Sequence, residues 1–255
     1  MYDFLKKPRD ITKYTLMRGV TDFGNLDQYN LFETGYSFLT IVSVPKWLET
    51  LASTDSNFAT LFANYLHILE YEFRGLDGLE DITSDSLELT NGISTMNMIS
   101  KVNQQSASQV SMRYFEKSGS VITRVHETFL KGIKDPRTQF KHYHGLIDSG
   151  ALEAGYENEV FTFLYGVTDN TGTELEKAYL LLSAQPTKAE TSMYVSEKGE
   201  IDKKEVTCEF NCFPITGNLV DQKAKAYLDY LNTVITKDSS SFAYTGIDKV
   251  TVPKK

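Results

Sequence analysis

The sequence has little cysteine: its 255 residues include two, Cys208 and Cys212. Both lie in the segment 205–214, where the cysteines, Val206 and Phe210 alternate with polar residues as on one face of a β-strand. Positions four apart on a strand are about 13 Å apart, whereas a disulfide needs Cα atoms within about 7 Å. The sequence therefore predicts two buried free thiols, in a chain long enough to bury a full core without a disulfide.

Motifs of enzymes and of cofactor sites are also missing from the sequence. It contains no glycine-rich phosphate loop, no dinucleotide-binding glycine pattern, no serine nucleophile elbow and no paired-histidine zinc motif. The acidic stretch 77–85 lacks the spaced ligands of a calcium loop. The sequence therefore predicts a protein without catalysis and without a cofactor.

Basic charge and long apolar runs are scarce as well. The formal net charge is −8, from 34 acidic and 26 basic side chains, which argues against a protein that grips nucleic acid by its phosphates. The same charge fits a surface past which DNA slides, and it equally fits plain solubility. The N-terminus has no secretory apolar segment, and runs such as 178–182 are far shorter than the ~20 residues of a membrane helix. We expect a protein made and assembled in a cytoplasm, without a membrane.

Tyrosine and phenylalanine are abundant, with 15 of each, and both favour β-sheet. Alternating or β-branched segments bounded by turn residues predict strands. These segments are 35–44, 79–89, 94–102, 107–115, 158–166, 177–183 and 205–213. Because most strand-to-strand connections are short, we expect antiparallel sheets in a mainly β or α+β fold.

Helical spacing of apolar residues appears in three segments. The first begins after Ser53 and ends near Gly75, the second spans 121–133 before Asp135 and Pro136, and the third spans 220–235. The predicted organisation is an N-terminal arm with the first strand (1–56), a main β domain (57–236) with an insertion near 185–204, and a polar tail (237–255). Residues 1–34 carry aromatic side chains without a regular period, which suits packing on a neighbouring subunit or on their own domain.

Three histidines are the candidates for metal chemistry. His142 and His144 are two positions apart, as on one face of a strand, and His126 lies upstream. No third ligand has motif spacing, so histidines in a loop are the simpler interpretation. Two alternative functions of other classes stay open at this point: a small metal-dependent hydrolase that uses His142 and His144, and a carbohydrate-binding module. A single tryptophan offers little platform for the second.

A series of segments in the centre of the chain resembles a known family. It runs through Gly75-Leu-Asp-Gly78, Met112-Arg-Tyr-Phe-Glu116, Ser118-Gly119, a helix, Gly132-Ile-Lys-Asp135-Pro136, a strand at 206–213 and a terminal helix. This order is similar to that of bacteriophage tail tube proteins, which are related to the tube subunits of type VI secretion and other contractile injection systems. The resemblance covers roughly residues 70–235, and the arm at 1–56 and the segment near 185–204 are additions to it.

The resemblance implies an antiparallel β-sandwich or barrel with flanking helices. It implies hexameric rings that stack into a hollow tube through which the genome passes without specific binding of DNA. Other partners would be tail sheath, tape measure and baseplate proteins, in a virion tail assembled in the host cytoplasm. Within the same class, a tube initiator, a tube terminator or a baseplate hub component is the alternative. The tube wall would be made of strands, so the candidates for acidic residues that face the bore are Asp81, Asp85, Glu88 and Glu116.

Overall fold

The structure is a computed structural model that describes residues 35–79, 83–90, 95–103, 108–194 and 203–238. These residues belong to one compact unit, Gly35–Lys255. The predicted arm at 1–34, nearly all of the predicted tail, part of the predicted insertion near 185–204, and Asp81 lie outside the described ranges. The division of the chain at residues 56 and 236 stays a prediction.

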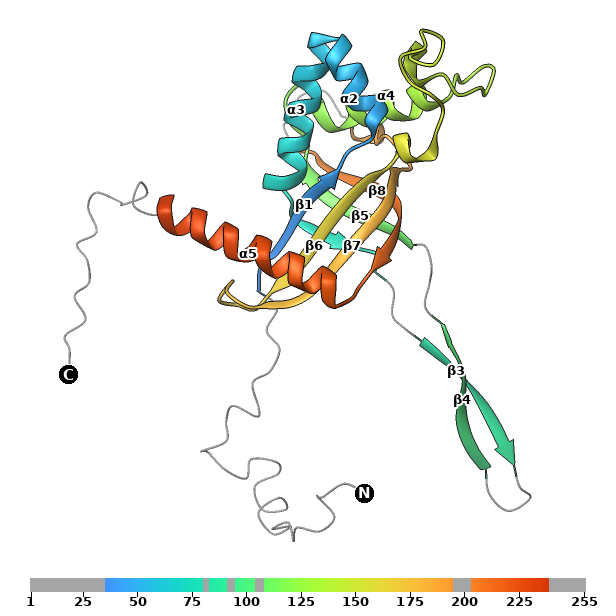
Figure 1. The fold of residues 1–255 in the computed structure, drawn as a ribbon, viewed down its shortest axis with the longest axis vertical. Helices are drawn as coiled ribbons and strands as arrows, with labels where there is room; N and C mark the ends of the chain where they lie inside the picture. The colour runs from blue at the N-terminus through green and yellow to red at the C-terminus, as the bar shows by residue number, and fades with distance from the viewer. Residues whose placement is uncertain (1–34, 80–82, 91–94, 104–107, 195–202, 239–255) are drawn as a thin grey trace, which may run out of the picture. The chain divides into compact units, whose positions relative to one another are not determined.

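The described strands form a six-stranded sheet in the order β1-β6-β7-β8-β5-β2 and a separate two-stranded hairpin, β3-β4 (Figure 1). The strands of the sheet are β1 (Ser37–Ser43), β2 (Gly75–Asp77), β5 (Ser108–Phe115), β6 (Phe161–Thr168), β7 (Leu175–Pro186) and β8 (Glu205–Ile215). The hairpin consists of β3 (Thr83–Thr90) and β4 (Thr95–Asn103). All of these pairings are antiparallel, which confirms the prediction from short connections.

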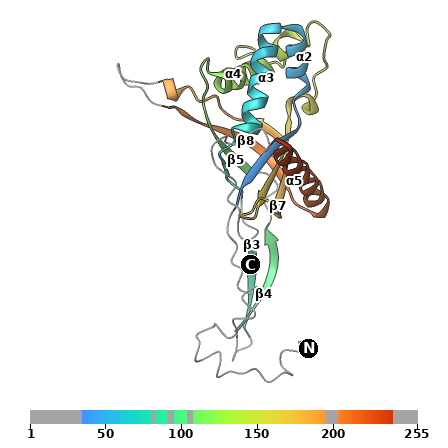
Figure 2. The same ribbon diagram turned by 90° about the vertical axis from the view of Figure 1, so that its left-hand side faces the viewer.

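The sheet is curled into a half-barrel flanked by helices (Figures 1 and 2). The register shifts between Ile41 and Ser43 in β1 and between Leu182 and Gln185 in β7. Such bulges bend a strand and increase its twist, so they contribute to the curl. The sheet-rich fold with flanking helices is as predicted, and within the described residues it takes the form of a half-barrel rather than a closed barrel or a sandwich.

Four α-helices lie in the described part of the chain: α2 (Lys46–Thr54), α3 (Ser56–Tyr71), α4 (Val121–Ile133) and α5 (Asn218–Asp238). In none of them is there a segment with both the length and the apolar composition of a membrane span. The predictions at 121–133 and 220–235 are confirmed. The helix predicted after Ser53 is confirmed as α3, whereas α2 was not predicted: it begins at Lys46 and buries Trp47, Leu48 and Leu51. Pro45 is the N-cap of α2, and its carbonyl accepts the first helical hydrogen bonds, from Leu48 and Glu49.

The two faces of the sheet are covered differently. One face is buried under α2, α3 and α4 along all six strands, with Phe163, Met112 and Phe210 in its core. On the opposite face, α5 covers β6 and β7 through Ala224, which packs near Leu164. The side of that face formed by β8, β5 and β2 has exposed or half-buried side chains. Strands β6 and β7 are therefore covered on both faces, whereas β8, β5 and β2 present an open face.

The strand predictions hold for β1, β4, β5, β6, β7 and β8 with boundary shifts of a few residues. The prediction of a single strand at 79–89 is inaccurate, since the structure has β2 at Gly75–Asp77 and β3 at Thr83–Thr90. The thiol prediction is confirmed, because Cys208 and Cys212 are free and buried in β8. Burial raises the pKa of both thiols, that of Cys212 to about 11.

Candidate assembly surfaces

The hairpin β3-β4 has an exposed apolar face. Leu87 lies opposite Met98, and Leu89 lies opposite Met96. Alternation along a strand puts these four side chains on one face, and each is between 45% and 61% exposed. Four large apolar side chains gathered on one exposed face mark a surface that is covered in an assembly.

On the other face of the hairpin, Glu88 lies opposite Asn97 and Thr90 lies opposite Thr95, so this part of the face is polar. Further along the same face, Ser86 lies opposite Ile99 and Ser84 lies opposite Val102, and both apolar side chains are exposed. All of the side chains of β3 are exposed. Between Leu87 and Met98 the hairpin is therefore amphipathic across its thickness, with an apolar face that suits contact with protein and a polar face that suits contact with water.

The open face of the six-stranded sheet carries paired charges. Arg113 of β5 forms an ion pair with Asp77 of β2 (Nε–Oδ2, 3.4 Å), and Arg74 pairs with Glu205 of β8 (Nη1–Oε1, 3.6 Å). Glu209 of β8 accepts a hydrogen bond from Gln109 Nε2 at 2.8 Å and forms an ion pair with Lys188. The acids of this face are thus each matched by a cation, so the face is strongly polar without a large local excess of either sign.

One outer edge of the sheet is occupied by a side chain. β1 stands at the end of the strand order, so its far side has no neighbouring strand among the described residues. The Glu70 carboxylate of α3 accepts hydrogen bonds there from Ile41 N at 2.8 Å and from Thr40 Oγ1 at 2.9 Å. A carboxylate on an edge amide hinders the addition of another strand at that point.

The four acids proposed for the bore from the sequence do not form one cluster. Asp81 lies outside the described residues. Asp85 is on the apolar side of β3, opposite Lys101, and Glu88 is on the polar side. Glu116 follows β5 and is bound to the start of α4: its two oxygens accept hydrogen bonds from Ile122 N and Thr123 N at 3.1 and 3.0 Å. Of the described three, Glu88 is the one on a polar, exposed strand face.

Three further acids, Asp77, Glu205 and Glu209, lie on the open face of the sheet, and the sequence did not lead us to name them as surface acids. For the two in β8 the sequence did contain an indication, because Glu205, Thr207 and Glu209 alternate with the buried residues of the opposite face. What the sequence could not show is that β8 pairs with β5, about a hundred residues away along the chain. That pairing is what brings these acids beside Gln109 and places them on a surface shared with β2.

The position of Glu116 leads to a stability prediction. Ser120 precedes α4 with a left-handed φ of 56° and makes no capping hydrogen bond, so the Glu116 carboxylate takes over the role of the N-cap. We expect Glu116→Ala to lower the free energy of unfolding by about 1–2 kcal/mol, as for the loss of an N-cap. Glu116→Gln should lower it less, since the amide oxygen still accepts one bond. Urea unfolding measures both, and Glu88→Gln is the control for the loss of a negative charge without a helix contact.

The histidines do not assemble a metal site in the described residues, among which no group of three or more potential ligands is found. His142 Nδ1 accepts a hydrogen bond from Gly145 N in a 3-10 turn, and His144 is exposed on the same turn. His126 lies apart from both, buried on α4. The simpler interpretation, histidines in a loop, is therefore confirmed, and the alternative of two histidines on one strand face is wrong because these residues form a turn.

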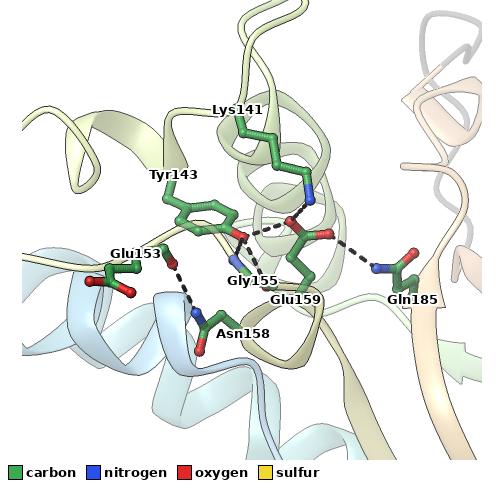
Figure 3. A network of polar contacts seen from close by, with 7 residues as sticks. All are labelled: Lys141, Tyr143, Glu153, Gly155, Asn158, Glu159 and Gln185. Atoms are coloured by element: carbon green, nitrogen blue, oxygen red, sulfur yellow. Dashed lines mark hydrogen bonds and ion pairs between the residues drawn. The ribbon is translucent and has the colours of Figure 1, made fainter.

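A buried polar network holds the loop that contains this turn (Figure 3). Glu159, which is buried, accepts hydrogen bonds from Lys141 Nζ and from Tyr143 Oη, both at 2.6 Å. Tyr143 also stacks on Trp47 of α2, and burial together with the bond to Glu159 raises its pKa to about 12. The salt bridge and the hydrogen bond thus hold the loop 134–159 together, and the aromatic stack on Trp47 fixes it to the core.

The chain matches the family model described as phage tail tube protein over residues 33–252. Since the match covers most of the chain, the protein belongs to the phage tail tube protein family. A search of curated protein sequences finds no match. Family membership confirms the resemblance seen in the sequence, and it makes the chain a structural component of a virion tail and not an enzyme.

Solved structures with some similarity come from contractile injection systems. They are the sheath-tube complex of an extracellular contractile injection system (13% identity, 77% of this chain and 98% of that chain, TM-score 0.35), the tube-terminating cap of the anti-feeding prophage (13%, 58% and 83%, 0.33), and a sheath/tube terminator of an extracellular contractile injection system (13%, 71% and 92%, 0.33). At these TM-scores they are distant neighbours, and the assignment rests on the family match.

Proposed function

We propose that this protein is the repeating subunit of the tail tube, which forms stacked hexameric rings around a bore that conducts the genome. The observation that carries the proposal is the part of the hairpin β3-β4 in which Leu87, Leu89, Met96 and Met98 are exposed on one face and Glu88, Thr90, Thr95 and Asn97 lie on the other. In a closed ring the apolar face would be covered by a neighbouring subunit, and the polar face would be left to water. A cyclic arrangement also satisfies the unpaired backbone groups of sheet edges.

Tail sheath, tape measure and baseplate proteins would be the further partners of such a tube, which would be assembled in the host cytoplasm. The alternative roles within the tail are tube initiator, tube terminator and baseplate hub component. Copy number separates them from a tube subunit. In purified particles, the band of this protein should be among the most intense, because a tube contains many rings. A band at the level of the minor tail proteins would contradict the tube role and favour one of the alternatives.

The polar face of the hairpin suggests how the bore treats DNA. We place Glu88 on the bore side of the hairpin. One carboxylate near one phosphate in water is worth about 1 kcal/mol at 4 Å, and the repetition of Glu88 around and along the tube multiplies the effect. Such a lining would keep a polyanion moving, whereas cations would hold it.

This placement leads to a prediction for genome delivery. We expect Glu88→Lys to leave tube assembly intact and to slow DNA ejection several-fold at low salt, with the defect shrinking as salt screens the phosphate contacts. The measurement is the ejection rate of particles across a salt series, and Glu88→Gln is the matched control without a positive charge. Native ejection rates from particles shown to carry Lys at position 88 would contradict the placement of Glu88 in the bore.

A further inference from the structure

The apolar face of the hairpin β3-β4 is built in part from methionine. Met98 lies opposite Leu87, and Met96 lies opposite Leu89. The two methionines are 50% and 61% exposed. Leucine and methionine fill a similar apolar volume, but methionine carries a thioether sulfur that an oxidant attacks and leucine does not. Two of the four apolar side chains on this face are therefore chemically reactive.

Met112 has the opposite environment. It lies in β5 and is fully buried in the core, where its sulfur accepts a hydrogen bond from Tyr114 Oη at 3.7 Å. A peroxide must reach the sulfur to transfer oxygen to it, so burial slows the reaction. The fold thus exposes Met96 and Met98 and shields Met112, which supplies an internal reference for the rate of oxidation.

Oxidation changes the apolar face of the hairpin at its centre. A hydroperoxide transfers one oxygen atom to the sulfur: the sulfide is oxidised by two electrons to the sulfoxide, and hydrogen peroxide is reduced to water. The sulfoxide oxygen accepts hydrogen bonds, whereas Leu87 and Leu89, which lie opposite, offer no donor. Burial of this polar group against an apolar surface without a hydrogen-bond partner is unfavourable.

We propose that Met96 and Met98 form a reversible oxidation site that controls the self-association of this chain. In the reduced form the apolar face is available to a neighbouring copy, and in the sulfoxide form it is not. Reduction of the sulfoxides restores the face, because methionine oxidation is reversible at this level. The control of assembly rests on the proposed tube function, whereas the selective oxidation of the free subunit does not.

Peptide mapping after treatment with hydrogen peroxide tests the site in the free subunit. Trypsin cleaves after Arg74, Lys101 and Arg113, so Met96 and Met98 fall in one peptide and Met112 falls in the next. Fragmentation of the first peptide separates Met96 from Met98. Both should be oxidised at least roughly tenfold faster than Met112, because their sulfurs are accessible to the peroxide. Equal rates for the three residues would overturn the site, whether or not the protein forms tubes.

Sedimentation and electron microscopy measure the effect on assembly, with a matched variant. The double substitution Met96→Leu and Met98→Leu keeps the apolar volume and removes both sulfurs, so this variant should assemble like the native protein before and after peroxide. Native protein oxidised at both positions should need a concentration at least roughly tenfold higher for assembly, since polar groups would be buried without partners. Methionine sulfoxide reductases with dithiothreitol should return it to its original value.

The outcomes separate this site from the tube. Oxidised native protein that assembles as well as the reduced protein overturns the control of assembly and leaves the tube function standing. An equal loss of assembly in the double leucine variant after peroxide also overturns it, because the effect then comes from another oxidised residue. If the unoxidised protein forms no assemblies at any concentration, the proposed tube function fails and the control of assembly fails with it, while the peptide map still decides the selective oxidation.

Discussion

Replacing Leu87, Leu89, Met96 and Met98 together with serine is expected to abolish tube formation and to leave the subunit folded. These side chains are exposed on the hairpin β3-β4, so their loss removes little burial from the folded monomer. In an assembly each would contribute about 1.5–3 kcal/mol on full burial. A loss of several kcal/mol per subunit raises the concentration needed for assembly by more than a hundredfold.

Electron microscopy and sedimentation measure assembly of the hairpin variant, and circular dichroism with urea unfolding verifies the fold. The matched control changes the opposite face of the same hairpin, with Thr90→Ser, Thr95→Ser and Asn97→Ser. These substitutions leave the apolar face unchanged and should assemble like the native protein. Tubes formed normally by the apolar-face variant would show that this surface is not an assembly surface, whereas equal failure of both variants would point to a general defect of the hairpin.

Acid is expected to destabilise the subunit through His126. This side chain is 2% exposed, and its Nδ1 lies 3.1 Å from the Lys188 carbonyl while its Nε2 lies 2.9 Å from Tyr65 Oη. A carbonyl can only accept, so Nδ1 carries the proton of the neutral ring and Nε2 accepts from Tyr65. Burial lowers the pKa of His126 from 6.5 to about 4.

The sign of the effect follows from which state binds the proton first. Above pH 6.5 the ring is neutral in both states and contributes no pH dependence. Between about pH 6.5 and pH 4, His126 takes up a proton in the unfolded chain but not in the folded protein. The free energy of unfolding therefore decreases as the pH is lowered through this range. The loss reaches about 3 kcal/mol near pH 4, from the difference between the two pKa values.

The comparison with His126→Gln isolates this contribution from that of the carboxylates. The glutamine amide can donate and accept hydrogen bonds but does not titrate in this range. Urea unfolding midpoints from pH 7.5 to pH 4 should fall more steeply for the native protein than for the variant, and the gap should open below pH 6.5. Parallel curves for the two proteins would contradict a neutral, buried His126.

Local sequence patterns predicted the elements that depend on local chemistry. Helix α4 was predicted with its observed ends, because apolar residues recur through it and Asp135 and Pro136 stop it. The buried thiols of β8 followed from strict alternation between Cys208 and Cys212. Helix α2 was missed, since its nine residues offer few periods and Pro45 at its start also ends a strand.

The surfaces proposed here depend on contacts that are distant in sequence and could not be predicted from it. Glu116 was taken for a strand-face acid, yet its carboxylate binds the first turn of α4, which becomes visible only when the 117–120 turn is known. The buried position of Glu159 gave no local signal either, because its partners Lys141 and Tyr143 lie more than a dozen residues earlier in the chain. The packing of α5 on β6 and β7 could not be predicted, since no local period reveals which strands a helix covers.

Cryo-electron microscopy of the purified protein at high concentration tests the tube assignment most directly. We expect stacked hexameric rings with a central bore, in which the face of the hairpin that carries Leu87 and Met98 is buried against a neighbouring subunit and Glu88 faces the bore. Protein that stays monomeric at all concentrations, or rings in which that apolar face remains open to solvent, would contradict it.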